Sequence, residues 1–93
     1  MTIAEPYTRI IENPLPAPYT HYEIQTIACW KAGQGEICEP VFTREQLQGV
    51  YRDRGTIQIG LYGRIEGRGA EWLADFNTVE EARERLRNMG VIR

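Results

Sequence analysis

Residues 56–89 constrain the fold most, because their hydrophobic pattern changes from a period of two to a helical period within one short stretch. In residues 56–65, an apolar residue or a glycine alternates with mostly polar residues, which is the pattern of a half-buried β-strand. A second apolar run follows the sequence Glu66-Gly67-Arg68-Gly69, and a reversal centred on Gly67 and Arg68 predicts a β-hairpin. The stretch is therefore expected to form two antiparallel strands that lead directly into a helix.

This turn fixes the residues that face each other across the hairpin. The expected pairs are Ile59 with Phe76, Leu61 with Ala74, Gly63 with Trp72, and Arg64 with Glu71. In this register the indole of Trp72 covers the bare backbone of Gly63, so Trp72 is expected to be buried. The Arg64–Glu71 pair then lies on the opposite, wetter face beside Tyr62.

After Asn77 the hydrophobic period becomes helical. Thr78 and Glu81 have the spacing of a capping box, in which the threonine side chain accepts a hydrogen bond from the backbone N–H three residues later. Apolar residues then recur at helical spacing, and Gly90 is placed to end the helix in a left-handed conformation. The apolar positions are Val79, Ala82, Leu86 and Met89.

A second hairpin and a second helix are expected earlier in the chain. Residues 21–31 alternate as a strand does, with exceptions at Thr26 and Ile27. A turn with Gly33 and Gln34 at its centre sets the register, and Pro40 keeps the return strand short. The expected pairs are Lys31 with Glu36, Trp30 with Ile37, and Cys29 with Cys38. A capping box of Thr43 and Gln46 then predicts a helix over residues 44–51, with Leu47, Val50 and Tyr51 as its apolar members.

The N-terminal segment is set apart by its prolines. Residues 1–20 hold four of the five prolines, so regular structure fits only between them, where residues 7–12 could form a short edge strand. At 93 residues, with 42% hydrophobic and 26% charged residues, the chain is long enough for one small domain over residues 1–93. We expect an α+β fold in the order β-β-α-β-β-α after an extended Pro-rich segment 1–20. Its antiparallel sheet has three to five strands, with both helices on one face.

Residues with catalytic or metal-binding chemistry are few. A zinc site needs four ligands, whereas His21, Cys29 and Cys38 supply at most three. The two cysteines permit a disulfide in an oxidising compartment, but the N-terminus lacks the pattern of a secretory signal, so we expect reduced thiols and a cytoplasmic location. No apolar run approaches the roughly 20 residues that span a bilayer. We therefore expect no catalytic, cofactor or metal site and no membrane association.

Arginine is the dominant cation, with ten arginines against the single Lys31. Guanidinium groups make bidentate contacts with carboxylates and phosphates and stack on aromatic rings, so they are common in protein and nucleic-acid interfaces. The candidate partner-binding patch around the hairpin comprises Arg52, Arg54, Tyr62, Arg64 and Arg68. The same residues would suit a nucleic-acid module that stacks bases on Tyr62. The formal net charge of −2 and the nearby Glu66 and Glu71 favour a protein partner over free nucleic acid.

The hairpin and its capped helix contain Tyr62-Gly63 and then the run Trp72-Leu73-Ala74-Asp75-Phe76-Asn77-Thr78-Val79-Glu80-Glu81-Ala82. This ending resembles that of many small proteins encoded by phages and prophages, among which anti-CRISPR proteins are one functional set. The resemblance implies a non-enzymatic inhibitor in the host cytoplasm that occludes a surface of a host defence or replication complex, such as a CRISPR effector complex. No residue role carries over from it. A structural accessory subunit is the further alternative.

Overall fold

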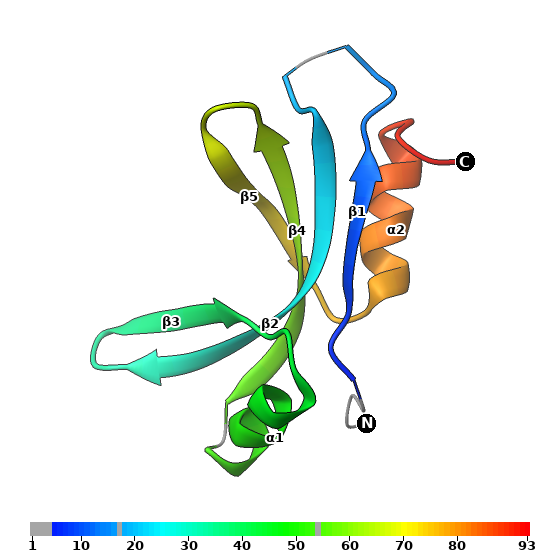
Figure 1. Ribbon diagram of the computed structural model, residues 1–93. Coiled ribbons are helices and arrows are strands. Elements are labelled where there is room, and N and C mark those ends of the chain that lie inside the picture. Colours follow the sequence, from blue (N-terminus) through cyan, green and yellow to red (C-terminus); the bar gives the residue numbers. More distant parts are fainter. Residues whose placement is uncertain (1–4, 17, 54) are drawn as a thin grey trace.

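The computed structural model describes residues 5–16, 18–53 and 55–93, which form five β-strands and two α-helices (Figure 1). The elements are β1 (Thr8–Glu12), β2 (His21–Ala32), β3 (Gly35–Pro40), α1 (Arg44–Arg52), β4 (Thr56–Ile65), β5 (Gly69–Phe76) and α2 (Val79–Asn88). The α+β class is confirmed. The expected element order was wrong by one strand, because β1 forms within the Pro-rich segment and gives the order β-β-β-α-β-β-α. The stretch between the prolines is free to pair, and the edge of β2 supplies its hydrogen-bond partners.

The sheet is organised around the long strand β2, and all of its pairs are antiparallel. One edge of β2 pairs with β4, which in turn pairs with β5; the other edge is shared by β1 and β3. Thr26 lies where these two edge strands meet, and it is fully buried. Its N–H donates to Tyr7 O at 2.8 Å, its hydroxyl accepts from Tyr7 N at 2.7 Å, and its carbonyl accepts from Val41 N at 2.9 Å. This junction explains the break in alternation at Thr26.

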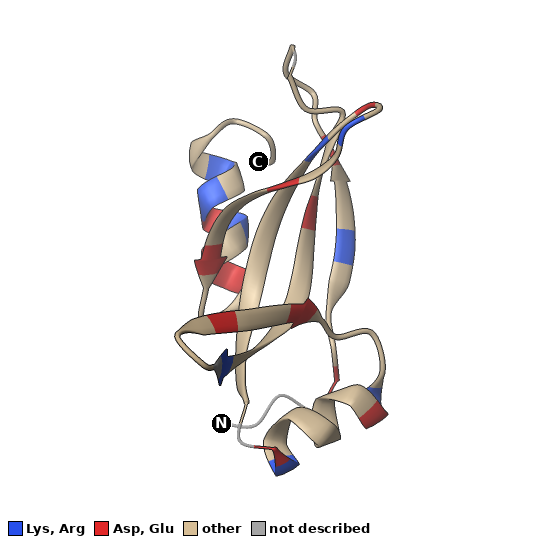
Figure 2. Cartoon of the chain, turned by 90° about the vertical axis from the view of Figure 1, so that its left-hand side faces the viewer, with Lys and Arg blue, Asp and Glu red and all other residues tan. Residues whose placement is uncertain are grey.

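Both helices pack on the same face of β2 and β4. Ile24 lies opposite Leu61 and Ala28 opposite Ile57, in one unbroken register, so these four side chains share a face. The first pair belongs to the core cluster under α2, and the second belongs to the cluster under α1. The opposite side, seen in Figure 2, presents the strands without a helix in front of them. We call this side the helix-free face; it carries Glu23, Gln25, Tyr62, Arg64 and Asp75.

The two helices begin where the sequence predicts. At α1 the capping box of Thr43 and Gln46 is complete, and at α2 the Thr78 hydroxyl accepts from the Glu81 N–H at 3.2 Å. Gly90 follows α2 with a φ of +83°, in the left-handed region. The buried helix residues are Leu47, Val50, Ala82 and Leu86, whereas Tyr51 and Met89 remain partly exposed. Neither helix in the described part of the chain is long and apolar enough to cross a membrane.

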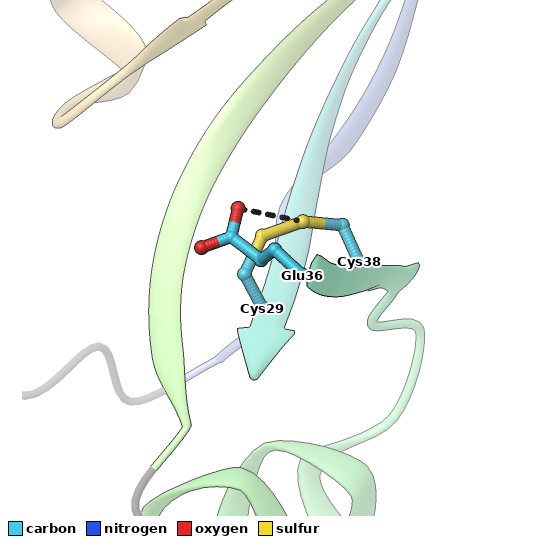
Figure 3. Close-up of side chains that lie close together, drawn as sticks. All are labelled: Cys29, Glu36 and Cys38. Carbon is cyan, nitrogen blue, oxygen red and sulfur yellow. Dashed lines mark hydrogen bonds between the residues drawn. A yellow bond between two sulfur atoms is a disulfide. The ribbon is translucent and has the colours of Figure 1, made fainter. Parts of the chain in front are cut away.

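The β2–β3 hairpin has the expected register, with Cys29 opposite Cys38. Their Cα atoms lie 4.1 Å apart and their sulfur atoms form a disulfide (Figure 3). The expectation of reduced thiols is therefore not met in this structure. Direct opposition in neighbouring strands brings the two sulfur atoms into bonding range, and the turn at Gly33 sets that opposition through its positive φ of +61°.

The β4–β5 hairpin matches the expected register only at the end away from its turn. Ile59 faces Phe76 and Leu61 faces Ala74, but the turn contains three residues, 66–68, so that Gly63 faces Glu71 instead of Trp72. A β-bulge at Leu73 absorbs the extra residue. The physical reason is the glycine content of the turn, because positive φ values of +80° at Gly67 and Gly69 permit the longer loop.

The bulge overturns the expectation that Trp72 is buried over Gly63. Trp72 is 59% exposed and lies opposite Tyr62, on the helix-free face. The ring of Tyr19 covers Gly63 instead, since a Cβ added at Gly63 would lie 2.5 Å from Tyr19 Cδ1. Tyr19 also packs on Tyr22, with ring centroids 5.4 Å apart. An aromatic ring does protect the glycine, but it comes from the loop before β2.

Candidate functional site

A row of side chains crosses the helix-free face from one edge of the sheet to the other. Ile10 of β1 lies opposite Glu23 of β2, Glu23 lies opposite Tyr62 of β4, and Tyr62 lies opposite Trp72 of β5. Residues directly opposite each other in neighbouring strands share a face, so all four point to the same side. Ile10 is 60% exposed and Trp72 59%, which leaves apolar surface open at both ends of the row.

A groove of about 220 Å³ lies beside the centre of this row. Its lining residues are Glu23, Gln25, Pro40, Phe42, Tyr62, Arg64 and Ala70. The floor comes from β2 and β4, whereas Pro40 ends β3 and Phe42 follows in the loop toward α1. The groove therefore joins segments that are distant in sequence, and it combines aromatic, aliphatic and charged side chains.

The backbone that carries Phe42 is held in place on both sides. Val41 is buried, and its carbonyl accepts a hydrogen bond from Gln25 Nε2 at 3.0 Å. The N–H of Phe42 donates to Gln46 Oε1 at 2.8 Å. The Phe42 side chain is nevertheless 62% exposed. An exposed ring on an ordered backbone can be buried by a partner with little loss of conformational entropy.

Tyr62 lies along its own strand, over Gly60. A Cβ added at Gly60 would meet Tyr62 Cε2 at 2.8 Å and the hydroxyl oxygen at 3.1 Å, so only a glycine leaves room for the ring. Burial raises the pKa of the Tyr62 hydroxyl, and the carboxylates of Asp75 and Glu23 raise it further. The ring is thus half-buried between two acidic groups, which favour its neutral form.

The two carboxylates beside Tyr62 differ in their partners. Glu23 forms a salt bridge with Arg64, through Oε2 and Nε. Asp75 accepts a hydrogen bond from the indole N–H of Trp72 at 2.9 Å. Among the described residues, no lysine or arginine forms a salt bridge with Asp75. One negative charge therefore remains uncompensated beside the Tyr62 ring.

The structure brings together only part of the predicted patch. Tyr62 and Arg64 meet in the groove, while Arg68 lies in the exposed β4–β5 turn. Arg52 lies on α1, at the other end of the molecule from that turn, where its Nε is 3.5 Å from Asp53 Oδ1 (Figure 1). Arg54 falls outside the described residues.

The expected Arg64–Glu71 pair was wrong. The shifted turn places Ala70 opposite Arg64, and Glu71 opposite Gly63. Arg64 finds its carboxylate on the other neighbouring strand, at Glu23. This salt bridge occupies the Arg64 guanidinium, which the sequence analysis had assigned to the partner-binding patch.

Three site residues were missed by the sequence reasoning. Phe42 carries no local signal, because it lies two residues after Pro40 in an irregular segment. Trp72 and Asp75 were separated by the expected register, which placed the indole in the core. The bulge at Leu73 turns Trp72 to the helix-free face, where it reaches Asp75. A sequence pattern with period two does not reveal such a bulge.

A second cluster of candidate ligands involves the disulfide. Atoms of Cys29, Glu36 and Cys38 lie within 4.8 Å of one another, and Glu36 Oε1 is 3.5 Å from Cys38 Sγ (Figure 3). A cysteine binds a metal ion as a thiolate, whereas the sulfur atoms of Cys29 and Cys38 are bonded to each other here. The cluster is therefore not a metal site in the oxidised protein.

Comparisons with family models, curated proteins and solved structures found no significant match to this chain. Figure 2 shows acidic positions along the strands, without a continuous basic stripe across them. Of the described residues that line the groove, Phe42 is the exposed aromatic one and Glu23 and Arg64 carry opposite charges, and none of these residues forms a nucleophile–base pair.

Proposed function

We propose that this protein is non-enzymatic and binds a protein partner through its helix-free face, centred on the groove. The observation that carries the proposal is the pair of exposed aromatic rings, Phe42 and Trp72, on either side of the half-buried Tyr62. Aromatic residues on ordered backbone dominate the binding energy of many protein interfaces. The row of side chains that crosses the sheet, with the exposed Ile10 at its β1 end, would supply the rest of the contact.

The size of the molecule fits this role. Its two longest extents are 42 and 27 Å, so one face can supply the roughly 800 Å² per partner that a standard stable interface buries. As part of the same proposal, the protein is an inhibitor of the phage type, which works in the host cytoplasm by occluding a surface of a defence complex such as a CRISPR effector. The resemblance of residues 62–82 supports this finer assignment.

Single-stranded nucleic acid is the second candidate partner, because aromatic side chains on an uncovered sheet face can stack bases. The charges weigh against it. Arg64 is neutralised by Glu23, and Asp75 adds a negative charge beside Tyr62. Such a surface lacks the concentrated positive potential that releases counterions from phosphates.

The test uses the full chain as bait in extracts of host cells, with proteins identified by mass spectrometry. Capture should fall at least tenfold for the double variant Phe42→Ala/Trp72→Ala. The control is Ile37→Ala/Met89→Ala, which also removes two exposed apolar side chains but leaves the groove intact. Both variants should remain folded, because truncation of exposed side chains costs little stability.

The reverse results would contradict the proposal. Equal capture by the groove variant and the control would exclude the helix-free face as the docking surface. Sub-micromolar binding of generic single-stranded nucleic acid at about 150 mM salt, where screening extends over roughly 8 Å, would promote the second candidate.

A further inference from the structure

The Tyr62 ring is half-buried and lines the groove. Its Cε2 and hydroxyl edge lies against the backbone at Gly60, where an added Cβ would be 2.8 Å from Cε2. Gly60 lies opposite Gln25 on β2 and Asp75 on β5. The Tyr62 ring, which lies over Gly60, therefore extends toward these two residues. The face of a phenol ring is negatively polarised and attracts cations.

Two carboxylates strengthen this preference. Glu23 lies directly opposite Tyr62, and Asp75 lies opposite Gly60, beside the ring. Burial raises the pKa of the Tyr62 hydroxyl, and these two carboxylates raise it further. Glu23 is compensated by Arg64, whereas the one hydrogen bond to the Asp75 side chain within residues 5–16, 18–53 and 55–93 comes from the Trp72 indole N–H, at 2.9 Å. A carboxylate accepts several hydrogen bonds, and this single bond leaves most of that capacity unused. The charge complement of the site is a single cation.

The surroundings favour arginine over a small cation. Pro40, Phe42 and Ala70 supply apolar surface in the groove, which suits the methylene stem of a long side chain. A guanidinium is planar and weakly hydrated, so it can stack on a ring and bond a carboxylate at the same time, unlike an ammonium group. The Glu23–Arg64 salt bridge already places one guanidinium against a carboxylate in this groove.

We infer that the groove accepts the stem of an arginine side chain of the partner protein, whose guanidinium stacks on Tyr62 and reaches Asp75, which lies beside the groove on β5. This inference rests on the proposed function and adds the chemistry of the partner. The stem of the arginine lies against Phe42, and Trp72 orients the carboxylate through its indole N–H.

The test is a titration of the full chain with the peptide acetyl-Gly-Arg-Gly-amide, followed by ¹H–¹⁵N NMR. The matched probes replace arginine with citrulline, which has the same shape but no charge, or with lysine. The arginine peptide should shift the Trp72 indole N–H and the Gly60 amide at millimolar concentration. Citrulline should bind roughly threefold to fivefold more weakly, as the loss of one exposed cation–π contact implies.

The protein variants locate the site. Asp75→Asn should weaken binding of the arginine peptide by a similar factor, and Tyr62→Leu should abolish the shifts. Glu36→Gln is the control, since it removes one negative charge from β3, outside the residues that line the groove. Equal binding of the arginine and citrulline peptides, or no effect of Asp75→Asn, would overturn the inference. If the NMR signals shift with protein concentration in the absence of peptide, the occupant of the groove is a second copy of this chain and not a partner protein.

Failure of the inference can be told apart from failure of the proposed function. If Phe42→Ala/Trp72→Ala abolishes capture from extracts but arginine and citrulline peptides bind equally, docking stands and the arginine is wrong. If the arginine peptide binds as expected but capture is insensitive to Phe42→Ala/Trp72→Ala, the groove is not the docking surface, and the proposed function fails together with the assignment of the arginine to the partner.

Discussion

Reduction of the Cys29–Cys38 disulfide should lower the free energy of unfolding by about 2.6 kcal/mol. The disulfide joins residues nine apart in sequence, and the loop-closure entropy of a cross-link of that length in the unfolded chain corresponds to this value at 25 °C. The native state should change little, because every residue of β3 is exposed and no member of the two core clusters belongs to it. The effect therefore arises chiefly in the unfolded state.

The assay compares thermal and urea unfolding of the oxidised and reduced protein. For a domain of this size, 1 kcal/mol shifts the melting temperature by about 4–8 °C, so the reduced protein should melt roughly 10–20 °C lower. The double variant Cys29→Ala/Cys38→Ala is the control, and its melting temperature should not respond to reductant. Thiol titration must show both cysteines free after reduction. If it does and the two midpoints still coincide, the argument from loop closure is refuted.

Two further perturbations test other parts of the structure. Gly63→Ala should lower the free energy of unfolding by about 1–3 kcal/mol, because the added methyl group would overlap the Tyr19 ring. Gly35→Ala is the control, since the space around Gly35 is open, and urea denaturation should show a much smaller loss of stability. The raised pKa of Tyr62 means that the folded state holds the phenol proton more tightly than the unfolded state does. Tyr62 therefore contributes a constant stability below a pH of about 10, and this contribution is lost as the pH rises further. The difference in absorbance at 295 nm between the wild type and Tyr62→Phe reports this titration, and Asp75→Asn should move it to lower pH; an unchanged titration would show that the two groups do not interact.

Local chemistry explains the features that were predicted correctly. Each helix begins at a threonine whose hydroxyl bonds the N–H three residues later, a contact that needs no other part of the chain. The β2–β3 register follows from a two-residue turn at Gly33, where one glycine with positive φ suffices. The helix starts and the β2–β3 register are therefore determined by residues close together in the sequence.

The local sequence is compatible with two lengths of the β4–β5 turn. Gly67 and Gly69 both permit positive φ, so turns of two and three residues are both accessible locally. Contacts from elsewhere favour the longer turn: Tyr19 covers Gly63, and Leu73 packs against the core cluster under α2. A shift of one residue reverses the face on which a side chain lies, which is why Trp72 was misplaced.

The sequence by itself determined the class of fold, both capped helices, the β2–β3 hairpin and the opposition of its cysteines, because each depends on residues close together in the chain. The candidate site was decided only by the tertiary structure. Phe42 and Tyr62, from a loop and a strand, line one groove only after β2 has paired with β4, and Trp72 reaches Asp75 only because a bulge shifts the turn end of β5. The free energy that selects this arrangement comes from long-range packing, and no local pattern records it.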